Sequence, residues 1–255
     1  MRLFFYSIFL HLSHFDCAQC TYTQKATMKI EDKEFQDRIE PLVSEHKKEL
    51  FNKVLDQRTR HLTVVIEDVF QSQNASAVLR SCDCFGIQDV HIIENRNEYD
   101  INPLVALGST KWLTMQKYNE KTYNTVDCIK SLKEKGYTIV ATSPHEEDIL
   151  LDELPLDKPI ALLFGTEAEG LTDKALEMAD VHMKIPMYGF TESFNISVSA
   201  AICIHTLTEK LRKTNIDWQL PQKEKDELYF EWLKKVVKKV EYHENELKKN
   251  YPKRS

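Results

Sequence analysis

The feature that most constrains this fold is the alternation of short apolar runs with longer helical patterns. Five runs are rich in β-branched and apolar residues, at 61–67, 89–94, 137–143, 160–165 and 181–187. Strands of this kind are buried on both faces, which is typical of parallel sheets. Segments with apolar positions at helical spacing separate most of these runs. The chain therefore predicts an α/β fold, a parallel sheet with helices on both faces.

Helices are predicted at residues 74–86, 121–135, 172–180 and 195–213. Glycines end the first two, and a threonine is placed to cap the third. Three loops that are polar or contain glycine follow predicted strands, at 68–74, 165–171 and 186–195. Because ligands in parallel α/β sheets bind at the carboxyl ends of the strands, we expect the chemistry to lie in these loops.

Helical patterns also flank the predicted sheet. Residues 31–57 are expected to form one or two amphipathic helices, interrupted near Pro41. Near the C-terminus, lysines flank a set of apolar residues at helical spacing, namely Leu228, Trp232, Leu233, Val236, Val237 and Val240. This segment predicts an amphipathic helix that packs on the core, or one that also presents its lysines to RNA.

The first 27 residues differ from those that follow. They contain an apolar, aromatic run of about ten residues, which is too short to span a membrane, and no small-residue cleavage site follows it. Met28 then begins a polar, helix-prone segment. We interpret residues 1–27 as a leader outside the functional chain, with a secretion signal as the alternative.

Cysteines and charge bear on compartment and partners. Cys17 and Cys20 form a CxxC pair in the leader, without the second pair that a zinc site needs. The other four are interpreted as small core residues, which favours a reducing, cytoplasmic compartment: Cys82, Cys84, Cys128 and Cys203. A net charge of −6 argues against a uniformly basic nucleic-acid binder but is compatible with a local basic face.

Each polar loop has an ordinary structural explanation when it is taken alone. Asn74 is placed to cap the helix that follows, and Arg80 to pair with the acidic residue three positions later. The glycines of FGTEAEGL (164–171) suit a tight turn, and the run is neither a GxGxxG site nor a P-loop. Either Ser193 or Asn195 suits the N-cap of the last predicted helix.

Taken together, the three loops resemble the motifs of the SpoU/TrmH family, RNA ribose 2′-O-methyltransferases of the SPOUT class. NASAVLRSCDCFG (74–86) matches the first motif, with its asparagine and an arginine six residues later. LLFGTEAEGLTD (162–173) matches the second, and IPMYGFTESFNISVSAAICIHTL (185–207) matches the third. GSTKWL (108–113) resembles a stretch between the first two motifs. The resemblance covers about residues 58–212 and is closest to members that methylate guanosine 18 of tRNA.

This resemblance implies a SPOUT methyltransferase domain at residues 61–213, whose C-terminal part threads a trefoil knot. Helical segments at 28–60 and 214–255 would flank that domain. It also implies S-adenosylmethionine bound among the knot loops, and a homodimer formed through the same region. Family members hold this cofactor largely through backbone groups, so we carry over four lining positions: Thr142, Gly165, Ile185 and Phe194. Phe194 stands where the family has leucine, and it is expected to supply an apolar wall with less room.

The implied reaction depends on a ribose hydroxyl, which is a weak acid and a poor nucleophile. The site must position this hydroxyl and stabilise the negative charge that develops on its oxygen. Arg80 is expected to do both, because a guanidinium is always charged and offers forked donors. Asn74 and Asn195 would orient these groups, and Glu167 would accept their hydrogen bonds. Ser193 would cap the following helix and line the pocket, and no metal is needed.

Basic residues outside the sheet are expected to hold the RNA, namely Lys47, Lys48, Lys53, Arg58, Arg60 and the C-terminal lysines. Each is equally compatible with a solvated surface charge. The predicted activity is 2′-O-methylation of guanosine 18 in tRNA, without a membrane. The alternatives are the same chemistry on ribosomal RNA or another tRNA position, a non-catalytic RNA-binding relative, and a nucleotide-binding oxidoreductase, which the missing GxGxxG disfavours.

Overall fold

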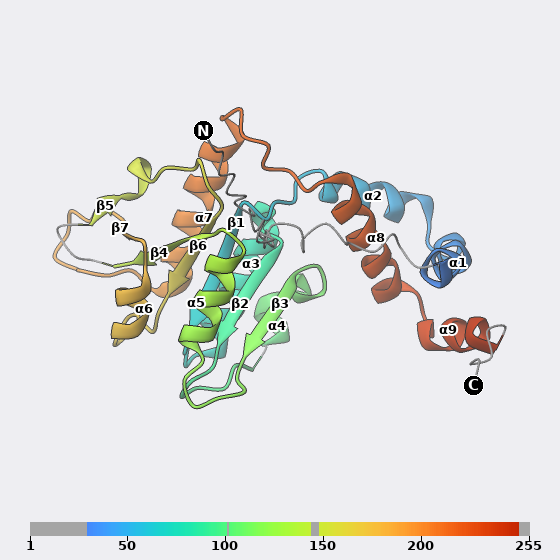
Figure 1. Ribbon diagram of the computed structural model, residues 1–255, viewed down its shortest axis with the longest axis horizontal. Helices are drawn as coiled ribbons and strands as arrows, with labels where there is room; N and C mark the ends of the chain where they lie inside the picture. The colour runs from blue at the N-terminus through green and yellow to red at the C-terminus, as the bar shows by residue number, and fades with distance from the viewer. Residues whose placement is uncertain (1–29, 101, 144–147, 250–255) are drawn as a thin grey trace, which may run out of the picture.

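The structure is a computed structural model that describes residues 30–100, 102–143 and 148–249 (Figure 1). The predicted leader and its Cys17 and Cys20 lie outside the described residues.

The described chain contains a seven-stranded sheet in the order β3-β2-β1-β6-β4-β7-β5. Every neighbouring pair is parallel, which confirms the predicted class of fold. The strands are β1 (Leu62–Glu67), β2 (Asp89–Ile93), β3 (Thr114–Tyr118), β4 (Thr138–Thr142), β5 (Ile149–Leu150), β6 (Ile160–Phe164) and β7 (Val181–Lys184). All five predicted strands are present, whereas β3 and β5 were not predicted. Both unpredicted strands lie at the edges of the sheet.

The described helices cover both faces of the sheet and also form a layer beside it. They are α1 (Ile30–Ile39), α2 (Glu45–Leu55), α3 (Ser72–Phe85), α4 (Pro103–Ala106), α5 (Thr125–Glu134), α6 (Asp173–Met178), α7 (Ile196–Arg212), α8 (Gln222–Val236) and α9 (Val240–Lys249). Short 3₁₀ turns lie at Glu40–Leu42, Ser109–Lys111 and Leu151–Glu153. Helices α3 and α7 pack on one face, and α5 and α6 on the other (Figure 1). None of the helices in the described ranges is long and apolar enough to cross a bilayer.

The two-layer packing follows from the residues of the central strands. All six residues of β1 are buried, and successive side chains face opposite layers. Val64 and Ile66 pack with α3 and α7, whereas Val65 packs with α5 and α6. Burying each such side chain contributes about 1.5–3 kcal/mol, which is why an unbroken apolar run is stable only as an interior strand.

The strand order determines where a ligand can bind. The chain adds β2 and β3 on one side of β1, and then places β6, β4 and β7 on the other side. Such a change of direction leaves a crevice outside the carboxyl ends of the central strands. The predicted functional loops follow β1, β6 and β7, so they lie at this same edge.

Helices from the two ends of the described chain form a separate layer, which we call the arm: α1, α2, α8 and α9. The arm lies to one side of the sheet (Figure 1). Its apolar core is centred on Trp232, whose ring lies 5.6 Å from that of Phe51 and 5.5 Å from that of Trp112. The chain turns between α8 and α9 at Lys239, where φ is 55°, so the predicted single C-terminal helix is two helices.

Two basic residues predicted to hold RNA have structural roles instead. Arg58 is 1% exposed, donates to Asp83 on α3 and to the carbonyl of Ile87 at 3.0 Å, and lies over the ring of Trp232. Arg60 pairs with Asp89 at 2.9 Å and with Glu224 on α8. These contacts join the arm to the sheet layer, because each arginine contacts residues of both.

Candidate active site

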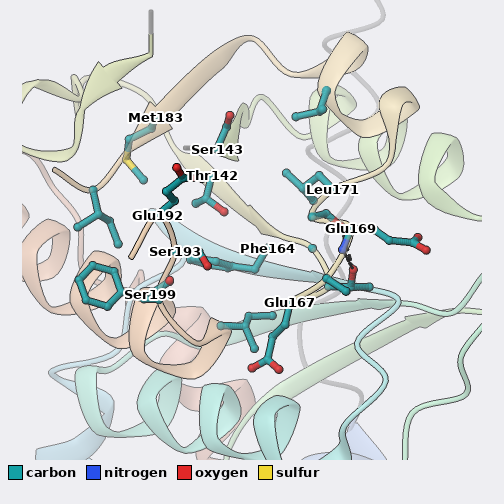
Figure 2. Close-up of a pocket in the computed structure, with 18 of the residues that line it drawn as sticks. Thr142, Ser143, Phe164, Glu167, Glu169, Leu171, Met183, Glu192, Ser193 and Ser199 are labelled. Carbon is teal, nitrogen blue, oxygen red and sulfur yellow. Dashed lines mark hydrogen bonds between the residues drawn. The ribbon is translucent and has the colours of Figure 1, made fainter. Parts of the chain in front are cut away.

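A cavity of about 420 Å³ opens at the carboxyl ends of β4, β6 and β7 (Figure 2). This volume lies within the range of small-molecule sites. The four positions carried over as cofactor-binding all line it, namely Thr142, Gly165, Ile185 and Phe194. Other lining residues were not identified from the sequence, including Leu171, Leu176, Met183, Met187, Glu192 and Ser199. Most are apolar or small residues that a sequence pattern does not distinguish from core.

One wall of the cavity is a turn of backbone after β6. The amide of Thr166 donates to the carbonyl of Gly170 at 2.9 Å, and the amide of Gly170 donates back at 3.0 Å. A Cβ on Gly165 would lie 2.1 Å from the carbonyl carbon of Gly170. The glycines are therefore required for a turn that closes on itself, and this turn presents backbone to the cavity.

A second polar feature lies beside the cavity, and we call it the amide–carboxylate cluster: Asn74, Glu167 and Asn195. The amide of Asn74 donates to Glu167 Oε1 at 2.7 Å. The amide of Asn195 donates to Asn74 Oδ1 at 3.2 Å and also to Glu167 Oε1. Glu167 lines the cavity and extends its carboxylate toward α3 (Figure 2). Side chains from three separate segments of the chain thus meet, and all three were selected from the sequence.

The local structure explains how Asn74 and Asn195 are positioned. Asn74 is the third residue of α3, so it lies in the first turn rather than at the cap. Asn195 is the N-cap of α7, where its side-chain oxygen accepts from the amide of Ser197 at 2.9 Å. Its NH₂ group therefore faces the cluster. The expectation that Ser193 caps this helix is wrong, because Asn195 occupies the cap, but Ser193 does line the cavity.

Arg80 is the predicted site residue that the structure brings neither to the cavity nor to the amide–carboxylate cluster. It is exposed on α3, about 9 Å along the helix axis from Asn74. Its side chain makes no hydrogen bond or ion pair with any described residue, and Asp83, its alternative partner, is paired with Arg58. The guanidinium therefore faces solvent on the outer side of the helix whose first turn carries Asn74.

Carboxylates dominate the charge around the cavity. Glu167, Glu169 and Glu192 are all among its lining residues (Figure 2). Arg96, from the loop after β2, holds Glu169 at 2.6 Å, and this hydrogen bond raises the pKa of Arg96. The acidic lining favours a ligand that carries positive charge.

The three motifs and the fold that carries them are those of a known family. Residues 61–205 match the SpoU rRNA Methylase family, and the chain belongs to this family, as its three motifs predicted. A tRNA (guanosine(18)-2′-O)-methyltransferase of Borreliella burgdorferi is 44% identical over 207 residues, which cover 81% of this chain and 93% of that protein.

Solved structures of related proteins share this fold. The A. aeolicus TrmH/SpoU tRNA modifying enzyme aligns with a TM-score of 0.69 and 28% identity, over 76% of this chain and 98% of that chain. The SpoU methyltransferase AviRb from Streptomyces viridochromogenes, solved in complex with the cofactor AdoMet, aligns with a TM-score of 0.54 and 20% identity. That alignment covers 62% of this chain and 63% of AviRb, and it bears on the fold alone.

Proposed function

We propose that this chain is an S-adenosylmethionine-dependent tRNA methyltransferase that modifies the 2′-hydroxyl of guanosine 18. The observation that carries the proposal is the convergence of Asn74, Glu167 and Asn195 beside a cavity with acidic lining. Family membership supports the reaction, and the 44% identical relative that acts on guanosine 18 of tRNA supports the substrate.

The cavity fits S-adenosylmethionine in its chemistry. The backbone turn from Gly165 to Gly170 lines the cavity with little side-chain bulk, and Ile185 and Phe194 offer apolar surface. The carboxylates suit the sulfonium and ammonium charges of this molecule, which supplies an electrophilic methyl group when bound. Thr142 would contribute as a wall, because its hydroxyl already donates to the carbonyl of Leu163 at 2.7 Å.

Each predicted side chain then has a distinct role. Arg80 would stabilise the negative charge that develops on the ribose oxygen, and it is unsuited to take the proton because a guanidinium is always protonated in proteins. A phosphate of the RNA or a water would receive that proton. Glu167 Oε1 already accepts from two amides, so we assign Glu167 to hold Asn74 and Asn195 in place. Ser193 would complete the cavity wall.

Several broader properties belong to the same proposal. We infer a methyltransferase domain at 61–213 with a trefoil knot, helical segments at 28–60 and 214–255, and a homodimer formed through the knot region. The lysines of the arm would hold tRNA by its phosphates. The free cysteines Cys82, Cys128 and Cys203 are buried, which agrees with a working place in the cytoplasm, whereas Cys84 is exposed and is not a core residue.

The direct test is methylation of unmodified tRNA with labelled S-adenosylmethionine, followed by mapping of the modified ribose. We expect one methyl group at guanosine 18, and none in a matched tRNA that carries 2′-deoxyguanosine at this position. Label on another nucleotide, or on ribosomal RNA only, would contradict the proposed substrate.

A further inference from the structure

Phe70 is a large aromatic side chain that is left exposed next to the amide–carboxylate cluster. Its side chain is 80% exposed, although Val69 before it is buried. It lies in the loop between β1 and α3, which also leads into the first turn that carries Asn74. Folding alone gives no reason to expose so large a ring, because burial would stabilise the chain. Beside a polar site, an exposed ring offers an aromatic face on which a ligand can stack.

The backbone that carries Phe70 is held firmly. Asp68 adopts a left-handed conformation, with φ of 53°, and is 2% exposed. Its Oδ1 accepts from the backbone amides of Asn95 at 2.7 Å and Arg96 at 2.8 Å. Its carbonyl accepts from the side chain of Asn97 at 2.8 Å. The ring is therefore presented from a fixed support rather than from a free loop, so little conformational entropy is lost when it binds.

Phe70 lies outside the cavity, on another part of the site. The neighbouring Gln71 accepts a hydrogen bond from the amide of Asn74 at 3.1 Å, which places the loop on the α3 side of the cluster. Phe70 is not among the residues that line the cavity. If the cavity takes the methyl donor and Arg80 on α3 contacts the ribose, as proposed above, the RNA nucleotide lies on the α3 side of the cluster.

We propose that the ring of Phe70 stacks on the base of the nucleotide whose ribose is methylated. This inference rests on the proposed function and deepens it. To present its 2′-hydroxyl, that nucleotide must leave the stack of the RNA, which costs a few kcal/mol. Proteins that bind unstacked bases commonly offset this cost with an aromatic platform, and every base has a face that suits it.

The sharpest test combines Phe70→Ala with a tRNA that keeps the ribose of nucleotide 18 but lacks its base. We expect Phe70→Ala to lower kcat/KM on intact tRNA by about ten- to a hundredfold. On the abasic tRNA the same substitution should have less than about a threefold effect, because no base is left to stack. We measure both kcat/KM and Kd for each combination of enzyme and tRNA. The Kd values allow the comparison even if the abasic tRNA is a poor substrate.

Two sets of control variants distinguish base stacking from a general loss of exposed apolar surface. Tyr123→Ala removes a ring that is 76% exposed at the same edge of the sheet but beside β3, and it should leave kcat/KM unchanged. Phe70→Tyr and Phe70→Trp should retain activity, whereas Phe70→Leu, which has no aromatic face, should not. The affinity for S-adenosylmethionine should be the same in all of these variants.

The outcomes are distinct. The stacking role is overturned if the wild type methylates guanosine 18 but Phe70→Ala is within threefold of it, or if the loss is equal on intact and abasic tRNA. An equal loss in Tyr123→Ala overturns it as well. If the wild type transfers no methyl group to tRNA, the proposed function fails, and the role of Phe70 falls with it.

Discussion

Aromatic side chains serve opposite purposes in the arm and at the carboxyl edge of the sheet. In the arm, Phe51 and Trp232 meet edge to face with each other and with Trp112, which precedes β3, and Trp232 is almost completely buried. At the sheet edge, Phe70 and Phe190 are 80% and 108% exposed. The rings of the arm are buried and stabilise the fold. The rings at the sheet edge are exposed, so their apolar surface is available to a ligand.

The same contrast holds for charged groups. Arg58 is buried against the arm, paired with Asp83 and stacked on Trp232. Arg80, three residues from Asp83 on α3, is exposed, and its guanidinium forms no hydrogen bond or ion pair within the described residues. Groups that are fully partnered in the folded chain stabilise it, and groups that lack partners at a site edge are available for binding. Four experiments test this division, in order of expected effect.

The largest effect is expected on the stability of the arm. Trp232→Ala should lower the free energy of unfolding by about 3–5 kcal/mol, because it removes a fully buried ring together with its contact to Arg58. Urea unfolding followed by circular dichroism measures this change. Tyr242→Ala, on the exposed surface of α9, is the control and should change stability by less than about 0.5 kcal/mol. A loss below about 1 kcal/mol in Trp232→Ala would show that the arm does not depend on this cluster.

The second experiment removes the exposed guanidinium. Arg80→Ala should lower the rate of methyl transfer by about 10²–10³-fold, the typical effect of deleting one donor to a developing oxyanion. Stability and S-adenosylmethionine affinity should not change, because Arg80 has no partner among the described residues and does not line the cavity. Cys84→Ala, one turn further along α3, is the control for the helix surface. A rate within threefold of the wild type would show that Arg80 does not stabilise the transition state.

The third experiment breaks the amide–carboxylate cluster. Glu167→Ala removes the acceptor shared by Asn74 and Asn195, and we expect the methyl-transfer rate to fall about five- to twentyfold. The effect is smaller than for Arg80 because the cluster positions groups and is partly open to water. Glu177→Gln, on α6 and outside the cavity lining, removes an exposed ion pair with Lys174 and should change the rate by less than about threefold, since such pairs contribute little. Equal losses in the two variants would argue against a specific role for Glu167.

The smallest effect concerns the lysines of the arm. Lys238→Ala and Lys239→Ala should each lower the slope of log Kd for tRNA against log salt concentration by about 0.7–0.9, if each contacts one phosphate. Filter binding at several salt concentrations gives this slope. Lys133→Ala, on α5 and paired with Asp180, serves as the control and should leave the slope unchanged. If the slope is unaltered in both variants, these lysines do not contact RNA phosphates and the RNA-binding face lies elsewhere.

Most of the sheet could be predicted because interior strands have an unbroken apolar pattern. The edge strand β3 could not, because only one neighbour pairs with it and its residues Thr114 to Tyr118 are mostly exposed or half-buried. The break between α8 and α9 was missed because no proline or glycine marks it. The left-handed residue there is Lys239, whose conformation depends on the packing of the arm.

The candidate site shows a similar limit. The meeting of Asn74, Glu167 and Asn195 could be anticipated, because parallel strands bring their carboxyl ends to one edge. The choice between Ser193 and Asn195 as helix cap could not, because both are good caps and only the path of the loop decides. The burial of Arg58 could not be predicted either, since its partner Asp83 is 25 positions away in the sequence.

The arm combines the first and the last helices of the described chain. Its apolar core can therefore form only late in translation. Helices α1 and α2 bury their apolar faces against α8. The two sides of this core are far apart in the sequence, since Leu220, just before α8, comes about 165 residues after Leu55 at the end of α2. At typical synthesis rates of about 5–20 residues per second, the first helices wait roughly 8–33 s for their partner. During that interval the ribosome holds a chain whose amino-terminal segment exposes apolar surface. We therefore expect the arm to be the last part of the described chain to complete its core.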